Sequence, residues 1–322
     1  MPVSLFSESE LSAASVSHIE PFWQSAVKTG SFQGKHDVPV SYAWCCPPQA
    51  RQSVLISSGR IESLLKYKEV IYDLYHHGYA VFILDHRGQG LSGRMTDNPH
   101  HGYVANFTDY VDDLLTFHRQ VITPHQRGAL SLLCHSMGGA IGALTILREP
   151  GLFERAVFCS PMFGIRPALP EPVAKGLLWL GQRKAIKAGV IADYFFGQTD
   201  YQAVPFGLNK LTHSDVRYQL FRSLYEAEPA IQLGGVTTAW LAAARQAMAE
   251  ITQQAPRLTL PCLLFSAGAD KVVDNRVQRA VARAMPHCQW VEISGARHEL
   301  LIEADRYRVP VMKQLLAFLD KS

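Results

Sequence analysis

Residues 134–139 (CHSMGG) contain a serine in a setting that is typical of a nucleophile. They follow an apolar stretch and precede Ala140–Leu144, whose small and apolar residues suit a closely packed helix. A serine at a sharp strand-to-helix turn projects its hydroxyl group outward, and the N-terminus of the following helix directs amide groups at developing negative charge. The pattern therefore predicts that Ser136 attacks a carbonyl carbon.

Two other residues could complete this chemistry, and they follow in the chain order serine, acid, histidine. Asp270 comes after the apolar run 261–267 and a glycine, and His298 comes after the run 289–293 and a glycine turn. Neutral His298 would take the proton of Ser136 as a general base. Asp270 would fix the tautomer of His298 and stabilise its imidazolium.

Both the acid and the serine have alternative interpretations. Asp274 is a rival acid, although its position suits the N-cap of a helix that starts near Asn275. Cys134 stands where the Gly-x-Ser-x-Gly pattern has its first glycine, so Ser136 taken alone could be a serine in a tight turn without chemistry. The partners in order favour the catalytic interpretation.

Backbone amides are expected to bind the oxyanion of an acyl-transfer reaction. Met137, next to the nucleophile, supplies one amide, and the second is expected in the turn Ser58-Gly59-Arg60, where we choose Arg60. Ser58-Gly59 replaces the usual His-Gly start of such a loop, so the other amides of this turn remain alternatives. Serine, histidine and amide donors suffice for the reaction, and no metal or organic cofactor is predicted.

Short apolar runs alternate with helical patterns, which predicts an α/β fold with a mostly parallel central sheet flanked by helices. The helical patterns are Ser63–His77, Thr108–Ile122 and, at the end of the chain, Asp305–Lys321. Ser31–Cys46 is expected to form an antiparallel hairpin at the sheet edge. The predicted strands are Val54–Ser58, Ala80–Asp85, Ala129–Cys134, Arg155–Ser160, Pro261–Ala267 and Gln289–Ile293.

The alternation breaks from about Met162 to Arg257, where helix formers and aromatic residues occur without a convincing strand. We therefore expect an α/β-hydrolase-like core at 1–161 and 258–322, and a helical cap inserted at 162–257. Within the insertion, Pro172–Ala192 contains four basic residues and no acid among apolar residues. Such a segment suits an anionic membrane surface or a lid over an apolar pocket, although an ordinary helix with a solvated face also fits.

The composition argues against several classes of protein. The formal net charge is +3, from 31 basic and 28 acidic residues, which gives no reason to expect a nucleic-acid partner. The six cysteines form no CxxC pair, so we expect thiols in a reducing compartment. Without a signal peptide or a run of roughly 18 apolar residues, the chain is expected in the cytoplasm, with contact at the inner face of the cell membrane left open.

The motifs together resemble those of a known family. Residues 85–93 (DHRGQGLSG), the turn at Ser136, residues 268–270 (GAD) and the turn 295–298 (GARH) resemble the monoacylglycerol-lipase-like branch of the α/β hydrolases. Residues 58–63 (SGRIES), followed by Lys66-Tyr67 and Arg94, resemble more closely the bacterial lysophospholipases of the inner membrane. The resemblance extends over nearly the whole chain, and in this group the position of Cys134 need not be glycine.

The resemblance implies a hydrolase that acts on a lysophospholipid or another single-acyl-chain lipid ester. An acyl-enzyme would form on Ser136, the glycerophospho head group would leave, and water activated by His298 would release the fatty acid. Hydrolysis of monoacylglycerol or short esters, and acyl transfer to another lipid, would use the same residues and remain open. A catalytically silent binding protein on this fold is an alternative of another class, but it would not need the three residues in order.

Overall fold

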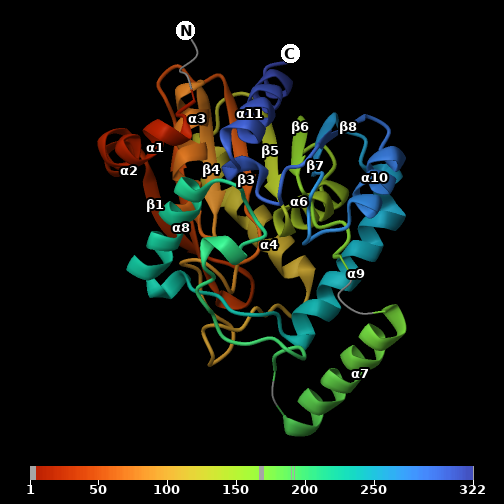
Figure 1. The fold of residues 1–322 in the computed structure, drawn as a ribbon. Helices are drawn as coiled ribbons and strands as arrows, with labels where there is room; N and C mark the ends of the chain where they lie inside the picture. Colours follow the sequence, from red (N-terminus) through yellow and green to blue (C-terminus); the bar gives the residue numbers. More distant parts are fainter. Residues whose placement is uncertain (1–4, 167–169, 190, 192, 322) are drawn as a thin grey trace.

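A single mixed sheet forms the centre of the protein. The computed structural model describes residues 5–166, 170–189, 191 and 193–321. Their strands follow the order β1-β2-β4-β3-β5-β6-β7-β8, and β2 pairs antiparallel with β1 and β4 while the other neighbours are parallel (Figure 1). The strands are β1 (Lys28–Gln33), β2 (Pro39–Cys45), β3 (Gln52–Ser57), β4 (Tyr79–Leu84), β5 (Leu130–His135), β6 (Arg155–Cys159), β7 (Cys262–Ala267) and β8 (Cys288–Ile293).

The predicted α/β fold with a mostly parallel sheet is confirmed. Every residue of β4, β5 and β7 is buried, because helices cover both faces of the sheet, and this burial explains the continuous apolar runs in the sequence. The expected antiparallel hairpin is formed by β1 and β2 at one edge. At the other edge, β8 is only partly buried.

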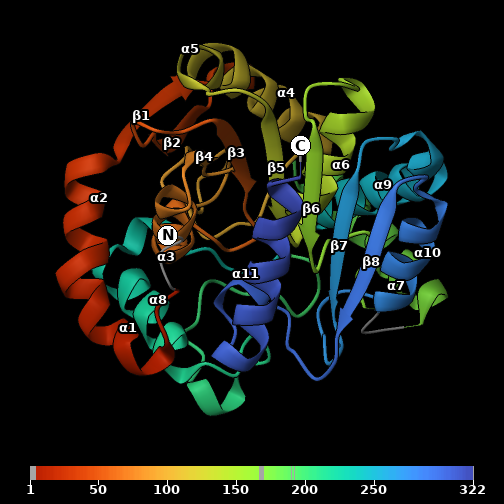
Figure 2. The same ribbon diagram turned by 90° about the horizontal axis from the view of Figure 1, so that it is seen from above.

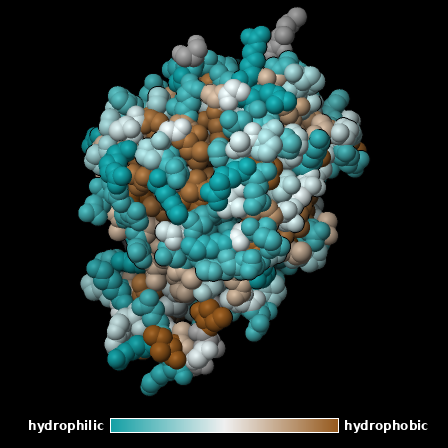
Figure 3. All heavy atoms as spheres, turned by 180° about the vertical axis from the view of Figure 1, so that it is seen from behind, coloured by the Kyte–Doolittle hydropathy of each residue, from teal (hydrophilic) through white to brown (hydrophobic). Residues whose placement is uncertain are grey.

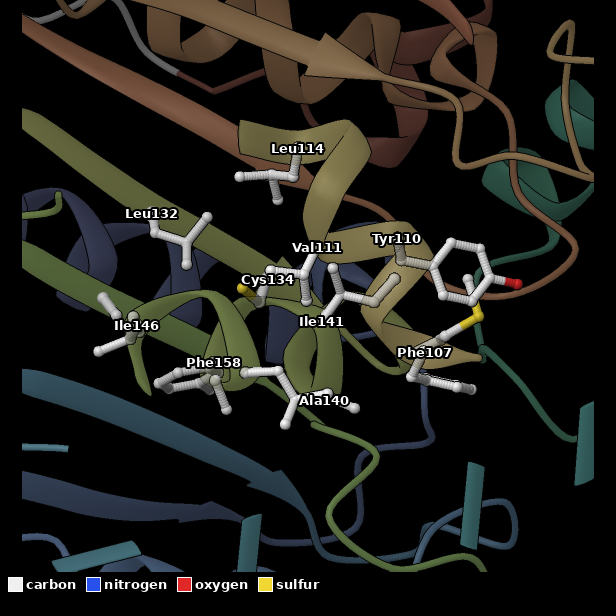
Figure 4. Close-up of a cluster of buried hydrophobic side chains, with 14 of the residues drawn as sticks. Phe107, Tyr110, Val111, Leu114, Leu132, Cys134, Ala140, Ile141, Ile146 and Phe158 are labelled. Carbon is white, nitrogen blue, oxygen red and sulfur yellow. The ribbon is translucent and has the colours of Figure 1, made fainter. Parts of the chain in front are cut away.

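Two layers of helices enclose the sheet (Figure 2). One core cluster joins the sheet to α4, α6, α9 and α10, and a second joins the opposite face to α2, α3 and α11. Figure 4 shows part of the first cluster, where Val111 of α4 and Ile141 of α6 lie near Cys134. The helices outside the insertion are α1 (Glu8–Ala14), α2 (Glu20–Ala26), α3 (Lys68–His76), α4 (Phe107–Phe117), α5 (Thr123–His125), α6 (Met137–Arg148), α10 (Asn275–Ala284) and α11 (Asp305–Leu319).

The segment between β6 and β7 contains three longer helices, α7 (Glu171–Ala188), α8 (Asp215–Ala227) and α9 (Thr238–Gln254). In its described residues it forms no strand beyond isolated bridges, such as Tyr194 with Thr237. Helix α9 packs on α6 and adds Trp240 and Ile251 to the main core, whereas α7 extends away from the body (Figure 1). The division into a core and a cap at 162–257 stays a prediction.

Helix α7 contains most of the basic, apolar segment singled out in the sequence, whose last residue, Ala192, lies outside the described residues. Two of its four basic residues pair with acids that flank the segment: Lys175 lies 3.5 Å from Glu171, and Lys184 lies 2.7 Å from Asp193. Its exposed apolar side chains are Val173, Trp179, Leu180 and Ile186, and Figure 3 shows brown side chains at this end of the molecule. In the part of the chain that the structure describes, no helix has the length and apolar composition for crossing a membrane.

The first and last helices cap each other. The amide of Glu8, at the start of α1, donates to the carboxylate of Asp305 at 2.7 Å, and the amide of Asp305, at the start of α11, donates to Glu8 at 2.9 Å. Arg217 of α8 also binds Asp305, at 2.9 Å, and pairs with Glu69 of α3 at 3.0 Å. The N-terminal helix is therefore tied both to the end of the chain and to the segment between β6 and β7.

Candidate active site

Ser136 lies at the turn between β5 and α6 with φ 50° and ψ −116°. A positive φ is uncommon for a residue with a side chain, and it indicates that the surrounding structure enforces the turn. The glycines that follow are required by space, because a Cβ at Gly138 would lie 2.0 Å from the carbonyl oxygen of Ser57. At Gly139 a Cβ would lie 2.5 Å from Pro161. The structure therefore has the sharp strand-to-helix turn that the sequence pattern predicts, with glycines where a side chain would not fit.

Cys134 fits the turn despite its departure from the glycine pattern. Its side chain is fully buried, and its sulfur faces Gly142 of α6. A Cβ at Gly142 would lie 2.5 Å from the Cys134 sulfur, well inside van der Waals contact. The space that the usual glycine would leave in β5 is therefore filled by the thiol, and the helix makes room for it at Gly142. All six cysteines of the chain are free thiols.

The structure brings the three predicted residues into one hydrogen-bonded chain. The hydroxyl of Ser136 lies 2.9 Å from Nε2 of His298, and Nδ1 of His298 lies 2.8 Å from Oδ2 of Asp270. The other carboxylate oxygen of Asp270 accepts the amides of Val272 and Val273 at 2.7 and 3.1 Å. Burial raises the pKa of Asp270, but the hydrogen bond from His298, its charge and the two amides outweigh burial and hold this pKa below its ordinary value.

Asp274, the rival acid, lies at the start of α10. Its carboxylate accepts the amide of Arg276 at 2.9 Å and pairs with the guanidinium of the same residue at 3.0 Å. Asp274 is thus the N-cap of α10, as its sequence position suggested. His298 bonds to Asp270 instead.

The two amides predicted for the oxyanion are available as donors. Among the described residues, neither the amide of Met137 nor that of Arg60 donates to another group of the protein. The turn that carries Arg60 lies beside the nucleophile, because a Cβ at Gly59 would lie 2.8 Å from Nδ1 of His135. Met137 and Arg60 therefore remain the predicted donors.

The motif at 85–93 holds its own loop in place. Oδ2 of Asp85 accepts the amide of Leu91 at 2.7 Å, and Arg87 makes two 2.6 Å bonds to Asp113 of α4. His86 lies 3.1 Å from the hydroxyl of Ser57. These contacts give the motif a structural role.

A buried ionic cluster beneath the active site was not assigned a role from the sequence. Lys66 donates to Glu62 at 2.5 Å and to Glu299 at 2.8 Å, and His135 lies 3.3 Å from both Glu62 and the carbonyl oxygen of His298. Burial alone would lower the pKa of His135, but the two carboxylates raise it to about 9. Glu62 and Lys66 belong to the residues on which the family resemblance rests. Their presence in that motif was the one feature of the sequence that pointed to this cluster.

Three members of this cluster, Glu62, His135 and Glu299, have ligand atoms within 4.8 Å of one another, as a metal site would require. The ammonium group of Lys66 already lies against both carboxylates. A cation would have to displace this buried ion pair, so the residues do not fit a metal centre.

Ser136 and His298 open into a cavity of about 740 Å³. Most of its wall is apolar, from residues of the segment between β6 and β7 and from the loop after β7, and a smaller part is basic. Such a cavity can enclose an apolar chain and leave a polar group near the basic side chains. The apolar lining includes Met162, Ile165, Leu208, Tyr218, Phe221, Leu233, Trp240, Leu241, Val272 and Val273.

Known proteins resemble this chain in sequence. The sequence matches the family described as "Serine aminopeptidase, S33" over residues 48–305. It is 35% identical to lysophospholipase L2 of Escherichia coli over 322 residues, which cover 98% of this chain and 93% of that protein. It is 29% identical to monoglyceride lipase of Rattus norvegicus over 225 residues, which cover 69% of this chain and 66% of that protein.

A solved structure gives the same fold. A soluble variant of monoglyceride lipase from Saccharomyces cerevisiae, in complex with a substrate analog, aligns with a TM-score of 0.72 at 16% identity and covers 92% of this chain and 96% of its own. The resemblance predicted from the motifs is thus confirmed. The chain is a hydrolase with the α/β-hydrolase fold and belongs to the serine aminopeptidase S33 family.

Proposed function

We propose that this protein hydrolyses the acyl ester of lysophospholipids, with Ser136, His298 and Asp270 as its catalytic residues. The observation that carries the proposal is the hydrogen-bonded chain of these three residues at the wall of a largely apolar cavity. The 35% identity to a lysophospholipase over nearly the whole of both chains supports this substrate class.

The geometry supports a two-stage reaction. His298 takes the proton of the Ser136 hydroxyl through Nε2 as the oxygen attacks the ester carbonyl, and Asp270 stabilises the imidazolium. The amides of Met137 and Arg60 bind the oxyanion. His298 then returns the proton to the departing glycerol oxygen, which leaves an acyl group on Ser136. In the second stage His298 deprotonates a water, which releases the fatty acid.

A substrate comparison tests the proposal. Purified protein is assayed with a lysophospholipid, a monoacylglycerol of the same acyl chain and a short nitrophenyl ester, and the products are identified. We expect release of fatty acid and the glycerophospho head group, no turnover by Ser136→Ala, and labelling of the wild-type protein by a fluorophosphonate probe. Folded wild-type protein that neither reacts with the probe nor cleaves any of the three esters would refute a hydrolytic role for Ser136.

Monoacylglycerol hydrolysis is the second candidate, because the monoglyceride lipase of the rat is also similar to this chain. The same residues would act, and the substrates differ only in the group that leaves. A kcat/KM for the monoacylglycerol at least tenfold above that for the lysophospholipid would favour this candidate.

We also propose that α7 contacts an anionic membrane surface from the cytoplasmic side. Trp179 and Ile186 are 56% and 79% exposed, and Arg183 lies over the ring of Trp179 at 4.5 Å. Lys187 adds a second cation without an ion pair among the described residues. An apolar stripe with adjacent cations is the composition that interfacial helices use, and a substrate held in a bilayer would be reached from such a position.

A further inference from the structure

The basic part of the cavity wall carries more positive than negative charge. Its basic residues are Arg60, Lys66, Lys210 and Arg222, and its acids are Asp200 and Glu299. Glu299 pairs with Lys66, whereas Asp200 accepts from two neutral donors, Tyr194 and, at 2.9 Å, Asn98, and keeps its negative charge. Arg60, Lys210 and Arg222 have no ion pair within the described part of the chain. The cavity therefore offers positive charge that the protein itself does not neutralise.

Two donors in this part of the wall lack an acceptor. The guanidinium of Arg222, on α8, lies 5.2 Å from the ring of Tyr201, and both residues line the cavity. Nη2 of Arg222 and the hydroxyl of Tyr201 are buried, and neither has a hydrogen-bond partner among the described residues. A buried donor without an acceptor is costly, and a charged one more so. An anionic oxygen within reach of both atoms would satisfy both donors.

Arg60 adds a second cation to the same wall. Its guanidinium donates through Nη2 to the carbonyl oxygen of Gly234 and lies 5.4 Å from the ring of Trp240, while its buried Nε has no partner among the described residues. Burial lowers the pKa of Arg60 to about 10, so the side chain remains charged at neutral pH. The groups that contact this guanidinium, a carbonyl oxygen and an aromatic ring, are neutral. Its positive charge can therefore attract an anion.

We propose that Arg222 and Tyr201 bind the phosphate of the substrate head group, and that Arg60 contributes a second positive charge to this subsite. The inference rests on the proposed function and specifies what the cavity recognises: a phosphodiester monoanion attached to the glycerol that carries the acyl ester. The guanidinium of Arg222 is charged and can donate two hydrogen bonds, and the hydroxyl of Tyr201 can donate another. Together they suit the oxygens of a phosphate. A monoacylglycerol offers only neutral hydroxyl groups, which accept more weakly than a charged phosphate oxygen, so the subsite favours phospholipid over neutral lipid.

The test is a selectivity ratio, which is kcat/KM for a lysophosphatidylethanolamine divided by kcat/KM for the monoacylglycerol with the same acyl chain in the same detergent micelles. Arg222→Met is expected to lower this ratio ten- to hundredfold, and Tyr201→Phe several-fold, since a hydrogen bond to a charged group is lost in each. Arg222→Lys keeps the charge and is expected to recover part of the ratio. Arg279→Met, which removes an arginine that stacks on Trp290 outside the cavity, is the matched control and is expected to stay within twofold of wild type.

A competition assay shows whether the subsite binds a head group or any phosphate. It uses soluble inhibitors in place of a phospholipid substrate. Glycerophosphoethanolamine is expected to inhibit monoacylglycerol hydrolysis by the wild type competitively, and to do so at least tenfold less well in Arg222→Met. Inorganic phosphate is expected to compete more weakly, because it lacks the glycerol that the active site also contacts.

The possible failures can be told apart. An unchanged selectivity ratio in Arg222→Met, in a protein that still cleaves lysophospholipid, would overturn the phosphate subsite alone. Equal competition by inorganic phosphate would overturn the assignment to a head group. Wild-type protein that cleaves monoacylglycerol but no lysophospholipid would overturn the proposed function and the subsite with it.

Discussion

The imidazole rings of His135 and His298 lie 5.0 Å apart, with the ring of His135 also 3.3 Å from the carbonyl oxygen of His298. His135, which precedes the proposed nucleophile, thus contacts the backbone of the proposed general base. Behind it, Glu62 and Glu299 form the ionic cluster with Lys66. His298 therefore packs against a buried group of charged side chains.

The two carboxylates beside His135 predict a specific dependence of stability on pH. The pKa of His135 is about 9 in the folded protein, above the ordinary value of 6.5. Its contribution to stability is therefore complete below pH 6.5 and is lost as the pH rises toward 9. We measure the free energy of unfolding in urea at pH 6 and at pH 9. Between these values we expect it to fall by on the order of 3 kcal/mol more in wild type than in His135→Gln. Equal losses in the two proteins would contradict a charged His135.

Removing the ammonium group from the cluster is expected to destabilise the fold. Lys66→Met leaves the buried carboxylates of Glu62 and Glu299 without their shared cation, at an expected cost of about 3–5 kcal/mol. Lys68→Met is a matched control, because Lys68 pairs with the more exposed Glu20 and is expected to change stability by about 1 kcal/mol or less. Thermal and urea unfolding measure both. A Lys66→Met protein as stable as the control would show that the carboxylates are protonated or solvated.

The two candidate acids are separated by matched substitutions. Asp270→Asn removes the carboxylate that orients His298, and we expect kcat to fall by about 10⁴-fold. Asp274→Asn keeps an N-cap side chain at the start of α10, so kcat is expected to remain close to that of wild type. Steady-state kinetics on one ester substrate compares the two. The reverse pattern would assign the acid to Asp274.

A larger residue at position 142 is expected to be tolerated better when the side chain at position 134 is smaller. Gly142→Ala would place a methyl group 2.5 Å from the Cys134 sulfur and is expected to destabilise the fold by about 1–3 kcal/mol. Cys134→Gly removes the sulfur, and in the double variant we expect more than half of the loss caused by Gly142→Ala to be recovered. A double-mutant cycle of unfolding free energies gives the coupling directly. Additive effects would mean that another neighbour opposes the methyl group.

Membrane contact through α7 can be measured by sedimentation with vesicles. Wild-type protein is expected to bind vesicles that contain phosphatidylglycerol more strongly than vesicles of phosphatidylcholine alone. Trp179→Ser with Ile186→Ser is expected to reduce binding at least fivefold, since two exposed apolar side chains are lost. Val16→Ser is the control, because Val16 is also an exposed apolar residue but is distant from α7 in the sequence. Binding unaffected by the double substitution would exclude α7 as the contact.

Much of the fold, and the meeting of the three candidate catalytic residues, could be predicted because each leaves a local signal. Strands β4, β5 and β7 are buried on both faces and read as short apolar runs. Ser136, Asp270 and His298 each follow such a run at a glycine-containing turn. Because β5, β7 and β8 run parallel, their carboxyl ends, and the three residues that follow them, lie at one edge of the sheet.

The buried cluster and the basic cavity wall could not be predicted in the same way. Lys66 and Glu299 meet across 233 positions, and the nearness of Tyr201 to Arg222 depends on how the segment between β6 and β7 folds over the sheet. Nothing in the local sequence distinguishes an arginine with a partner from one without. The ion pairs of Lys175 and Lys184 likewise could not be predicted from Pro172–Ala192, because their partners Glu171 and Asp193 lie just outside that segment.

The mutual capping of α1 and α11 has a consequence during protein synthesis. Glu8 and Asp305 are 297 positions apart, so at about 5–20 residues per second a ribosome needs roughly 15–60 s to make the second after the first. Throughout that interval α1 lacks its partner in α11, although Phe22 can already pack on Tyr72 and Tyr75 of α3, which are made soon after it. The amide of Glu8 therefore receives its partner only after α11 has been made, so a helix synthesised early gains one of its stabilising contacts late.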